Sequence, residues 1–540
     1  MAARLIWAAV TALLGGALLW RRLRTASSDR WELQLSWILR AVTVALCLFW
    51  AAVWLGLAWV RLRFPFELEW IGGAMRDHCL QVLQGKPLYV PPGAGWFPYE
   101  YPPLYFWVCA LLMRFLGASF VPMRLVSILS TLGCVGLTVA WVRRKIGNGR
   151  EAAEAKEPGG REYRPGSAWG WIAAGVFLAT YRFTGAWYDA ERLDMLFLFL
   201  SLLGVYWLEL ATEDARRSVM FGALSALAFG LAFLTKQQAV LFLAAGAAAL
   251  AWRRDGKTLV TFLFVALVVC IGSVQALNRA TDGWFGYYCF HVPLSNGIQL
   301  PLARMFLVED LPLYLPLIAL LALVAVWQWR PQGQEGAERG RDAVLIAMTA
   351  AGVLGSLLSR AHWGGAENVL MTAYLFIAAA ASVVAGRLEA RAEMPSWPLY
   401  VLALAQLLTL TYRPDQQLPR TANRAAGEAY QAAIRRLERE GEVLCLDHGG
   451  LTATPHFQIM GLLDVMHTEK RLPPGLIEAL HAHRYAAIVT DAKPEGGDVF
   501  GEVRKEYDVS ECLHMTQPWV ITGFLTPGPD RPVWVLRPHR

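Results

Sequence analysis

Two acidic residues stand close together near the start of the chain, among aromatic residues. Glu67 and Glu69 lie in the stretch Phe66-Glu67-Leu68-Glu69-Trp70. Their spacing puts them on one face of an extended chain, but about 200° apart around a helix. A carboxylate near apolar groups has a raised pKa, which suits a general base. The alternative is that both carboxylates face water near a membrane surface.

A second acidic stretch lies between two apolar blocks. It reads Trp187-Tyr188-Asp189-Ala190-Glu191-Arg192-Leu193-Asp194 and places three carboxylates beside one arginine. A loop that only connects two helices does not need so many charged residues, so the stretch indicates a polar site. Asp194 also has a simpler explanation, since an acid is favourable at the start of a helix. Arg192 can pair with a phosphate group or with Glu191, and surface ion pairs form easily.

Basic and polar residues stand at the ends of other apolar blocks. Lys236 lies in Thr235-Lys236-Gln237-Gln238, Arg124 near the start of the block 121–142, and His362 in the turn 360–368. An unpaired charge at the edge of a bilayer costs a few kcal/mol. Lys236 and Arg124 therefore either extend to the lipid headgroups or bind an anionic group. His362 has either a structural or a functional role.

The elements that must position these residues are membrane helices. Of 540 residues 56% are hydrophobic and 17% are charged, and the apolar residues form blocks long enough to cross a bilayer. We expect a mostly α, polytopic membrane helical bundle of about 11 to 13 spans. Residues 5–20 are expected to form an additional uncleaved span. The other expected spans are 36–60, 121–142, 169–186, 194–211, 218–234, 238–252, 258–277, 311–328, 343–359, 369–386 and 397–412.

The distribution of Lys and Arg predicts the orientation of the bundle. Basic residues stay on the cytoplasmic side of short loops, and they cluster in 143–168, 212–217, 253–257, 329–342 and 387–396. The alternation holds only if 102–117 forms a surface or re-entrant helix that does not cross. The outer segments are then 61–120, 187–193, 235–237, 278–310, 360–368 and the tail. The net charge of +7 is therefore a signal of topology and does not indicate nucleic-acid binding.

The tail from about residue 413 has a different character. Residues 424–440 have the apolar spacing of an amphipathic helix, and 442–446 and 486–490 are typical of short buried strands. We expect three parts: a hydrophobic segment and basic linker (1–35), a transmembrane domain (36–412) and a small extracytoplasmic α/β domain (413–540). Asp447-His448-Gly449-Gly450 follows a strand end, where ligand sites are common. His456, Asp464 and His467 follow, without the spacing of a metal site.

The order of these motifs resembles the GT-C glycosyltransferases. The resemblance rests on the acidic pair in the first outer loop, Gly85-Lys86-Pro87-Leu88-Tyr89, the patch from Tyr99 to Tyr105, and Arg124 opening the next span. The loop 189–194 and the Thr-Lys-Gln turn fit the same pattern. The likeness covers about residues 36–390 and is greatest to the branch containing protein O-mannosyltransferases and lipid A aminoarabinose transferases.

This resemblance implies a function and a role for each site residue. Such enzymes move a sugar from a polyprenyl-phosphate carrier to an extracytoplasmic glycan, lipid or protein acceptor, by a single displacement that inverts the anomeric centre. By that likeness Glu69 is the first choice for the catalytic carboxylate and Glu67 the second. The acidic loop would orient the acceptor or hold a divalent cation with water, and cations would neutralise the carrier phosphate. The acceptor or cation site would be formed by Asp189, Glu191 and Asp194. The carrier phosphate would be bound by Lys236, Arg124, Arg192 and His362.

Two other functions fit the same sequence. A transporter or flippase of a lipid-linked sugar would also be a polytopic bundle, although transport pathways carry ionisable residues within the spans. The expected spans hold few acids, and the polar residues gather in the outer loops. A third possibility keeps the fold without the activity, with the tail as an assembly module.

Overall fold

The fold is described from a computed structural model. It covers residues 30–539 except a set of short segments and loops: 94, 148–154, 157–161, 164–165, 167, 296, 319–320, 322–341, 363, 391–395 and 516–530. The expected span 5–20 lies outside the described residues.

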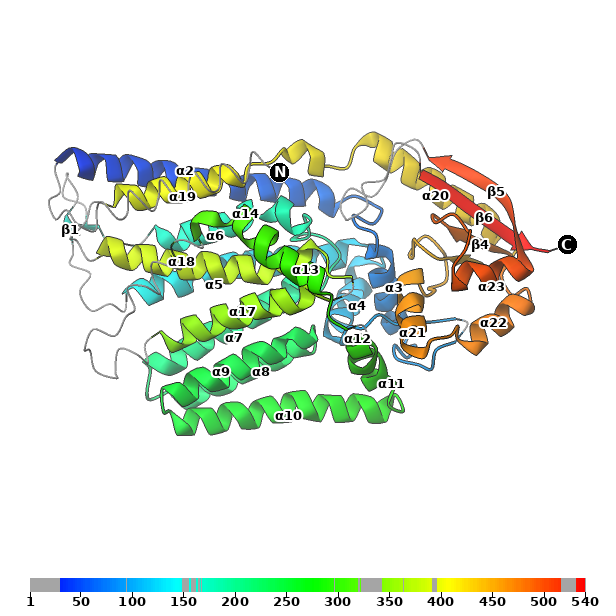
Figure 1. The fold of residues 1–540 in the computed structure, drawn as a ribbon, viewed down its shortest axis with the longest axis horizontal. Helices are drawn as coiled ribbons and strands as arrows, with labels where there is room; N and C mark the ends of the chain where they lie inside the picture. The colour runs from blue at the N-terminus through cyan, green and yellow to red at the C-terminus, as the bar shows by residue number, and fades with distance from the viewer. Residues whose placement is uncertain are drawn as a thin grey trace.

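Roughly parallel helices form a bundle that makes up most of the molecule (Figure 1). Six helices are long and apolar enough to cross a membrane, in the part of the chain that the structure describes: 31–62, 121–147, 194–213, 256–280, 343–360 and 367–390. The bundle helices are α2 (Arg30–Leu62), α5 (Val121–Gly147), α6 (Trp169–Ala179), α7 (Asp194–Glu213), α8 (Ser218–Phe233), α9 (Val240–Trp252), α10 (Gly256–Ala280), α17 (Ala343–Arg360), α18 (Leu370–Ala390) and α19 (Trp397–Thr409). These positions follow the predicted apolar blocks closely.

The predicted span 311–328 differs from the others. Its described part begins with α14 (Leu311–Tyr314) and is interrupted at Leu315, whose backbone leaves the helical region. Residues 322–328 lie outside the described residues. The preceding segment 284–310 forms short helical pieces: α11 (Trp284–Gly286), α12 (Val292–Ser295) and α13 (Leu300–Met305), with π-helical turns at Tyr287–His291 and Phe306–Asp310.

The first long loop stays at one end of the bundle. It contains α3 (Gly72–Leu83) and α4 (Leu104–Leu116). The Arg124 guanidinium at the start of α5 donates to the backbone carbonyls of Arg61 and Phe64 at the end of α2. The Leu104 N–H donates to the carbonyl of Leu234 at the end of α8. Since these ends meet, α4 lies across the end of the bundle and does not span it, as the charge pattern predicted.

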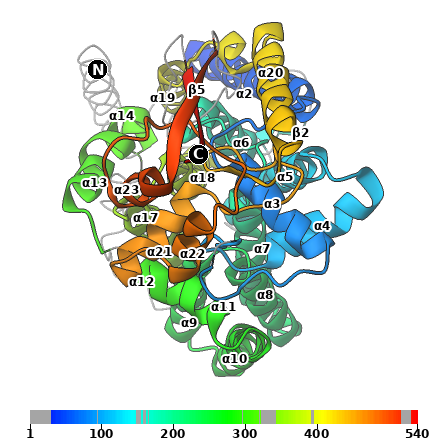
Figure 2. The ribbon, with the colours of Figure 1, turned by 90° about the vertical axis from the view of Figure 1, so that its right-hand side faces the viewer.

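The C-terminal part folds around a four-stranded sheet of order β3-β4-β6-β5. β3 (Val443–Cys445) pairs in parallel with β4 (Ala487–Thr490), and β6 (Arg531–Pro538) pairs antiparallel with β4 and with β5 (Tyr507–Met515). Four helices flank it: α20 (Thr421–Glu438), α21 (Ile459–Glu469), α22 (Pro474–His481) and α23 (Asp498–Glu506). Viewed end-on, this domain covers the end of the bundle that carries the first loop (Figure 2).

The first loop and the C-terminal domain share their apolar cores. Phe64, Phe66 and Leu68 pack with Tyr430 and Ile434 of α20 and with one face of the sheet. Residues of α3 and α4, including Met75 and Phe106, belong to one cluster with Leu444, Phe457 and Leu462. Burial of this apolar surface stabilises the contact between the two parts. The C-terminal domain is therefore packed onto the loop that carries Glu67 and Glu69.

Candidate active site

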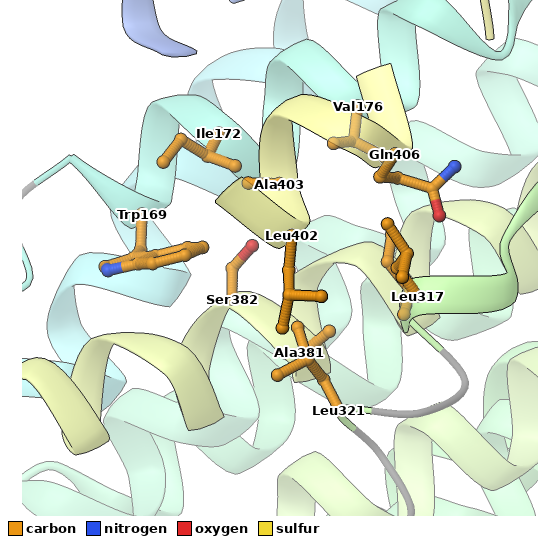
Figure 3. Close-up of a pocket in the computed structure, with 11 residues that line it drawn as sticks. Trp169, Ile172, Val176, Leu317, Leu321, Ala381, Ser382, Leu402, Ala403 and Gln406 are labelled. Atoms are coloured by element: carbon orange, nitrogen blue, oxygen red, sulfur yellow. The ribbon is translucent and has the colours of Figure 1, made fainter. Parts of the chain in front are cut away.

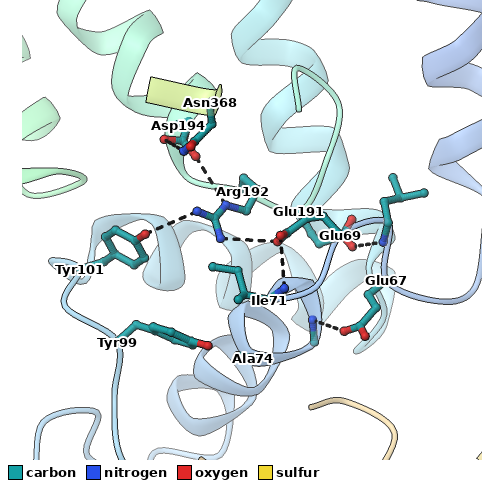
Figure 4. A network of polar contacts seen from close by, with 12 residues as sticks. Glu67, Glu69, Ile71, Ala74, Tyr99, Tyr101, Glu191, Arg192, Asp194 and Asn368 are labelled. Atoms are coloured by element: carbon teal, nitrogen blue, oxygen red, sulfur yellow. Dashed lines mark hydrogen bonds and ion pairs between the residues drawn. The ribbon is translucent and has the colours of Figure 1, made fainter. Parts of the chain in front are cut away.

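Arg192 lies at the centre of a buried polar network that joins three segments of the chain (Figure 4). Its guanidinium is 3.5 Å from a carboxylate oxygen of Glu69 in the first loop and 3.5 Å from one of Asp194 at the start of α7. It also donates to the Tyr101 hydroxyl at 3.4 Å. All three contacts are longer than an ordinary charged hydrogen bond. Within the described residues, neither Arg192 Nε nor Asp194 Oδ2 has a hydrogen-bond partner.

Asp194 connects Arg192 to Lys236 and Asn368. Its Oδ1 accepts hydrogen bonds from Lys236 Nζ at 2.8 Å and from the Asn368 side-chain amide at 3.0 Å. The Lys236 side chain remains 13% exposed, whereas that of Asp194 is 5% exposed. The network therefore combines two cations and an amide around one carboxylate, with Lys236 at the solvent-accessible side.

Of the pair Glu67 and Glu69, Glu69 faces this network. Its residue is fully buried, and it accepts a hydrogen bond from the Ile71 N–H at 3.2 Å. Burial raises the pKa of Glu69 to about 8, although Arg192 opposes the shift. A carboxylate with such a pKa accepts a proton far more readily than an ordinary glutamate.

Glu67 faces the C-terminal domain instead. It contacts His448 Nδ1, and its second oxygen accepts from the Gly73 N–H at 2.7 Å. The other ring nitrogen of His448 is 2.7 Å from Asp491 Oδ2. Neither His448 nor Asp491 is among the predicted site residues, although the stretch Asp447–Gly450 follows a strand end, where ligand sites are common.

Glu191 and Arg124 form a buried pair that holds the first loop. Arg124 Nε is 2.7 Å from Glu191 Oε2, and the Leu68 N–H donates to the other oxygen at 2.6 Å. The remaining Arg124 nitrogens donate to backbone carbonyls, including that of Phe66. The donors of Arg124 are thus committed to protein acceptors, so its predicted contact with a carrier phosphate would require these bonds to break.

Asp189 and His362 lie apart from the Arg192 network. Asp189 Oδ2 is 3.0 Å from Arg61 Nε at the end of α2, and its other oxygen accepts from the Tyr181 hydroxyl at 2.8 Å. His362 Nε2 is 2.9 Å from the carbonyl oxygen of Pro293. These partners, Arg61, Tyr181 and Pro293, are different from those of Arg192 and Lys236. The assignments of Asp189 and His362 to the acceptor and phosphate sites stay predictions.

The acidic residues do not form an evident metal centre. Within the described ranges, no group of three or more His, Cys, Asp or Glu side chains could hold a metal ion. Asp189 and Asp194 each already face a protein cation, Arg61 and Lys236. Because these charges are compensated, these residues do not fit a divalent cation.

An apolar pocket lies inside the bundle, away from this network (Figure 3). It is bordered by α6, α18, α19 and the residues after α14, and Ser382 and Gln406 are its polar lining residues. Such a lining offers no acid, base or cation for group transfer. The candidate catalytic groups are instead those of the polar network at the end of the bundle.

Known proteins match both the sequence and this fold. A family model described as Glycosyltransferase family 87 matches residues 99–359, which include Tyr101, the acidic loop and Lys236. No curated protein sequence matches the chain. Among solved structures, that of the Archaeoglobus fulgidus oligosaccharyltransferase tethered to an acceptor peptide aligns with a TM-score of 0.41 and 11% identity, covering 93% of this chain and 74% of that chain.

The helical bundle, its polar end and the sequence match define a polytopic membrane glycosyltransferase of the GT-C superfamily. The fold is similar to that of ArnT from Cupriavidus metallidurans. The apo structure of ArnT aligns with a TM-score of 0.55 and 16% identity, covering 91% of this chain and 97% of that chain. The structure of ArnT bound to undecaprenyl phosphate aligns with a TM-score of 0.55, 15% identity and the same coverage. The predicted superfamily and the predicted fold class are thereby confirmed.

Proposed function

We propose that the protein transfers a sugar from a polyprenyl-phosphate carrier to an extracytoplasmic acceptor, in a single displacement that inverts the anomeric centre. The observation that carries the proposal is the position of Glu69: a buried carboxylate of raised pKa lies beside Arg192, which connects it through Asp194 to Lys236. Glu69, at one end of this network, can accept a proton, and Lys236, at the other end, can bind a phosphate.

The loose contacts of Arg192 support a phosphate ligand. A buried guanidinium N–H without an acceptor is unfavourable by about 1–3 kcal/mol or more, and Arg192 Nε has no hydrogen-bond partner within the described residues. A phosphate oxygen would satisfy this donor and would also accept from Lys236, which is partly exposed. Arginine is well suited to such contacts because its donors match phosphate geometry. The ArnT structure with undecaprenyl phosphate shows that a protein of this fold binds such a lipid.

The proposed reaction forms one bond and breaks another at the anomeric carbon. The acceptor hydroxyl oxygen attacks this carbon while Glu69 takes up the hydroxyl proton. The bond from the carbon to the phosphate oxygen breaks, and its electron pair leaves with the polyprenyl phosphate. Lys236 and Arg192 stabilise the charge that builds on the departing phosphate. Attack and departure on opposite faces of the sugar account for inversion.

The charge distribution supports an extracytoplasmic site. Basic residues gather at the end of the bundle opposite the polar network: Arg143, Arg144, Arg216, Arg217, Arg253, Arg254, Lys257 and Arg387. Cytoplasmic loops carry such an excess of Lys and Arg. The polar network and the C-terminal domain would then lie outside the cytoplasm.

Sugar transfer from radiolabelled polyprenyl-phosphate sugars in membranes tests the proposal, with wild type compared with Glu69→Gln and Glu67→Gln. Glu69→Gln should reduce transfer by about 10²- to 10⁴-fold, the usual contribution of a general base, while retaining binding of the lipid phosphate. The anomeric configuration of the product, determined by NMR, should be opposite to that of the donor.

Three outcomes would change this assignment. Loss of transfer in Glu67→Gln alone would make Glu67 the base, and equal activity of all three proteins would remove the first loop from the chemistry. Sugar-lipid translocation that survives Glu69→Gln, with no transfer by wild type, would favour a transporter or flippase.

A further inference from the structure

One buried histidine of the C-terminal domain contacts an acidic residue of the first loop. His448 is fully buried and lies between two carboxylates, Glu67 of the first loop and Asp491 directly after β4. His448 and Glu67 are 381 positions apart in the sequence. A histidine can donate a hydrogen bond to each of two carboxylates only when its imidazole is protonated, because both ring nitrogens then carry a hydrogen.

The backbone around His448 is fitted closely to α3. A Cβ atom added to Gly73 would overlap the carbonyl oxygen of Gly449. The Gly450 N–H donates to Asp77 at 3.1 Å, and its carbonyl accepts from Arg76 at 2.8 Å. This contact tolerates little displacement, so the position of His448 relative to Glu67 is well defined.

Glu67 in turn fixes the segment that carries Glu69. Residues 63–71 form neither helix nor strand, so no regular hydrogen bonding holds them. Their position depends on side-chain contacts: Glu67 with His448 and Gly73, and Glu191 with the Leu68 N–H. Releasing Glu67 would remove one of the supports on the N-terminal side of Glu69.

We propose that His448 is a positioning residue of the transfer reaction, which ties the C-terminal domain to Glu67 and thereby holds Glu69 against Arg192. The site is then complete only when the C-terminal domain is docked. The inference rests on the proposed function, because it assigns a role in that reaction to a residue that touches no substrate.

The charge of His448 makes the link sensitive to pH. Burial lowers the pKa of His448, but Asp491 and Glu67 more than offset this and raise it from 6.5 to about 9. Burial raises the pKa of its partner Glu67 to about 7, so both members of this ion pair are charged between about pH 7 and 9. The contribution of the protonated ring is lost as the pH rises through about 9. Above that pH the ring has one donor for two carboxylates, and one contact is lost. The titratable groups facing the ring are Glu67, Asp491, Asp447, Tyr430 and Cys445.

The pH dependence of kcat between pH 6 and 10 tests this role, measured with a polyprenyl-phosphate sugar that wild type uses. Wild-type kcat should fall above pH about 9. His448→Gln should lower kcat about 10- to 100-fold, as expected of a displaced catalytic group, and should lack the alkaline fall. Asp491→Asn should move the fall to lower pH, because the ring loses one of its two carboxylates. His481→Gln is the matched control, since His481 is an exposed histidine paired with Glu506.

A double substitution separates positioning from a general loss of structure. If His448 acts through Glu67, the kcat of Glu67→Gln with His448→Gln should be no lower than that of the worse single variant. Independent losses that multiply would overturn the inference, as would an unchanged alkaline fall in His448→Gln. Both results leave the proposed function intact if wild type transfers sugar. A wild type without transfer would overturn the proposed function and this inference with it.

Discussion

Glu67 and Glu69 are separated by a single residue, yet their side chains contact different residues. The Leu68 N–H is held by Glu191, Glu67 contacts His448, and Glu69 contacts Arg192. In an irregular segment each side chain follows its own contacts, so the two acids need not share a face. Their different surroundings favour Glu69 as the base and Glu67 as a support.

Transfer should depend on pH through Glu69. A base must be deprotonated, and burial raises the pKa of Glu69 from 4.5 to about 8. We therefore expect kcat to rise about tenfold per pH unit below pH 8, as for a single ionising group, and to level off between about pH 8 and 9, above which deprotonation of His448 lowers it. Steady-state transfer assays at fixed donor and acceptor concentrations measure this. A rate that is flat between pH 6 and 8 would contradict a base with this pKa.

Lys236 should contribute to binding of the donor phosphate. Lys236→Met removes a charge-assisted hydrogen bond, worth about 1.5–3 kcal/mol, and should raise the KM for the polyprenyl-phosphate sugar about 10- to 100-fold. Lys257→Met is the control, because Lys257 is an exposed lysine of α10 at the opposite end of the bundle. An unchanged KM in Lys236→Met would remove this lysine from the phosphate site.

At the scale of the elements, α4 has two apolar faces. Tyr105, Phe106 and Cys109 are buried against the first loop, whereas Trp107, Leu111 and Phe115 are exposed at helical spacing. An exposed apolar stripe on a helix that does not cross the bundle is typical of a helix lying in the membrane interface. We infer that this face of α4 contacts lipid.

Spin labelling tests the position of α4. A nitroxide on Phe115→Cys, where the side chain is 78% exposed, should be relaxed mainly by oxygen, which concentrates in lipid. A label on Lys493→Cys, an exposed site of the C-terminal domain, should be relaxed mainly by a water-soluble nickel complex. Equal relaxation of both labels by the nickel complex would place α4 in water.

At the scale of the whole molecule, the polar segments collect at one end of the bundle. The first loop, the loop before α7, Lys236 and Asn368 meet there. The C-terminal domain covers this end of the bundle (Figure 2). The basic clusters lie where α5, α7, α9 and α18 end and where α8 and α10 begin. These helix ends point away from the C-terminal domain (Figure 1). This separation predicts the direction of the bundle in the membrane.

Labelling of single cysteines in intact cells tests that direction. A membrane-impermeant maleimide should react with Lys493→Cys without permeabilisation and with Lys257→Cys only after it. Wild type is the background control, because seven of its eight cysteines are buried and Cys512 is partly buried. The reverse pattern would place the site in the cytoplasm and contradict the proposed orientation.

The sequence by itself determined the class of the protein and the ends of most helices. Apolar blocks must lie in lipid, and backbone hydrogen bonding makes them helices, so the spans follow from local composition. The basic loops also predicted that residues 102–117 do not cross. The amphipathic pattern of 424–440 and the apolar runs 442–446 and 486–490 correspond to α20, β3 and β4. The strands β5 and β6 were not predicted.

Only the tertiary structure decided which polar groups meet. The contacts of Arg192 with Glu69, of Arg124 with Glu191 and of His448 with Glu67 join residues 123, 67 and 381 positions apart. Local periodicity carries no information about such pairs, because they depend on how whole segments pack. Packing therefore separated Glu69 from Glu67, committed Arg124 to backbone carbonyls, and brought a histidine of the C-terminal domain to the first loop.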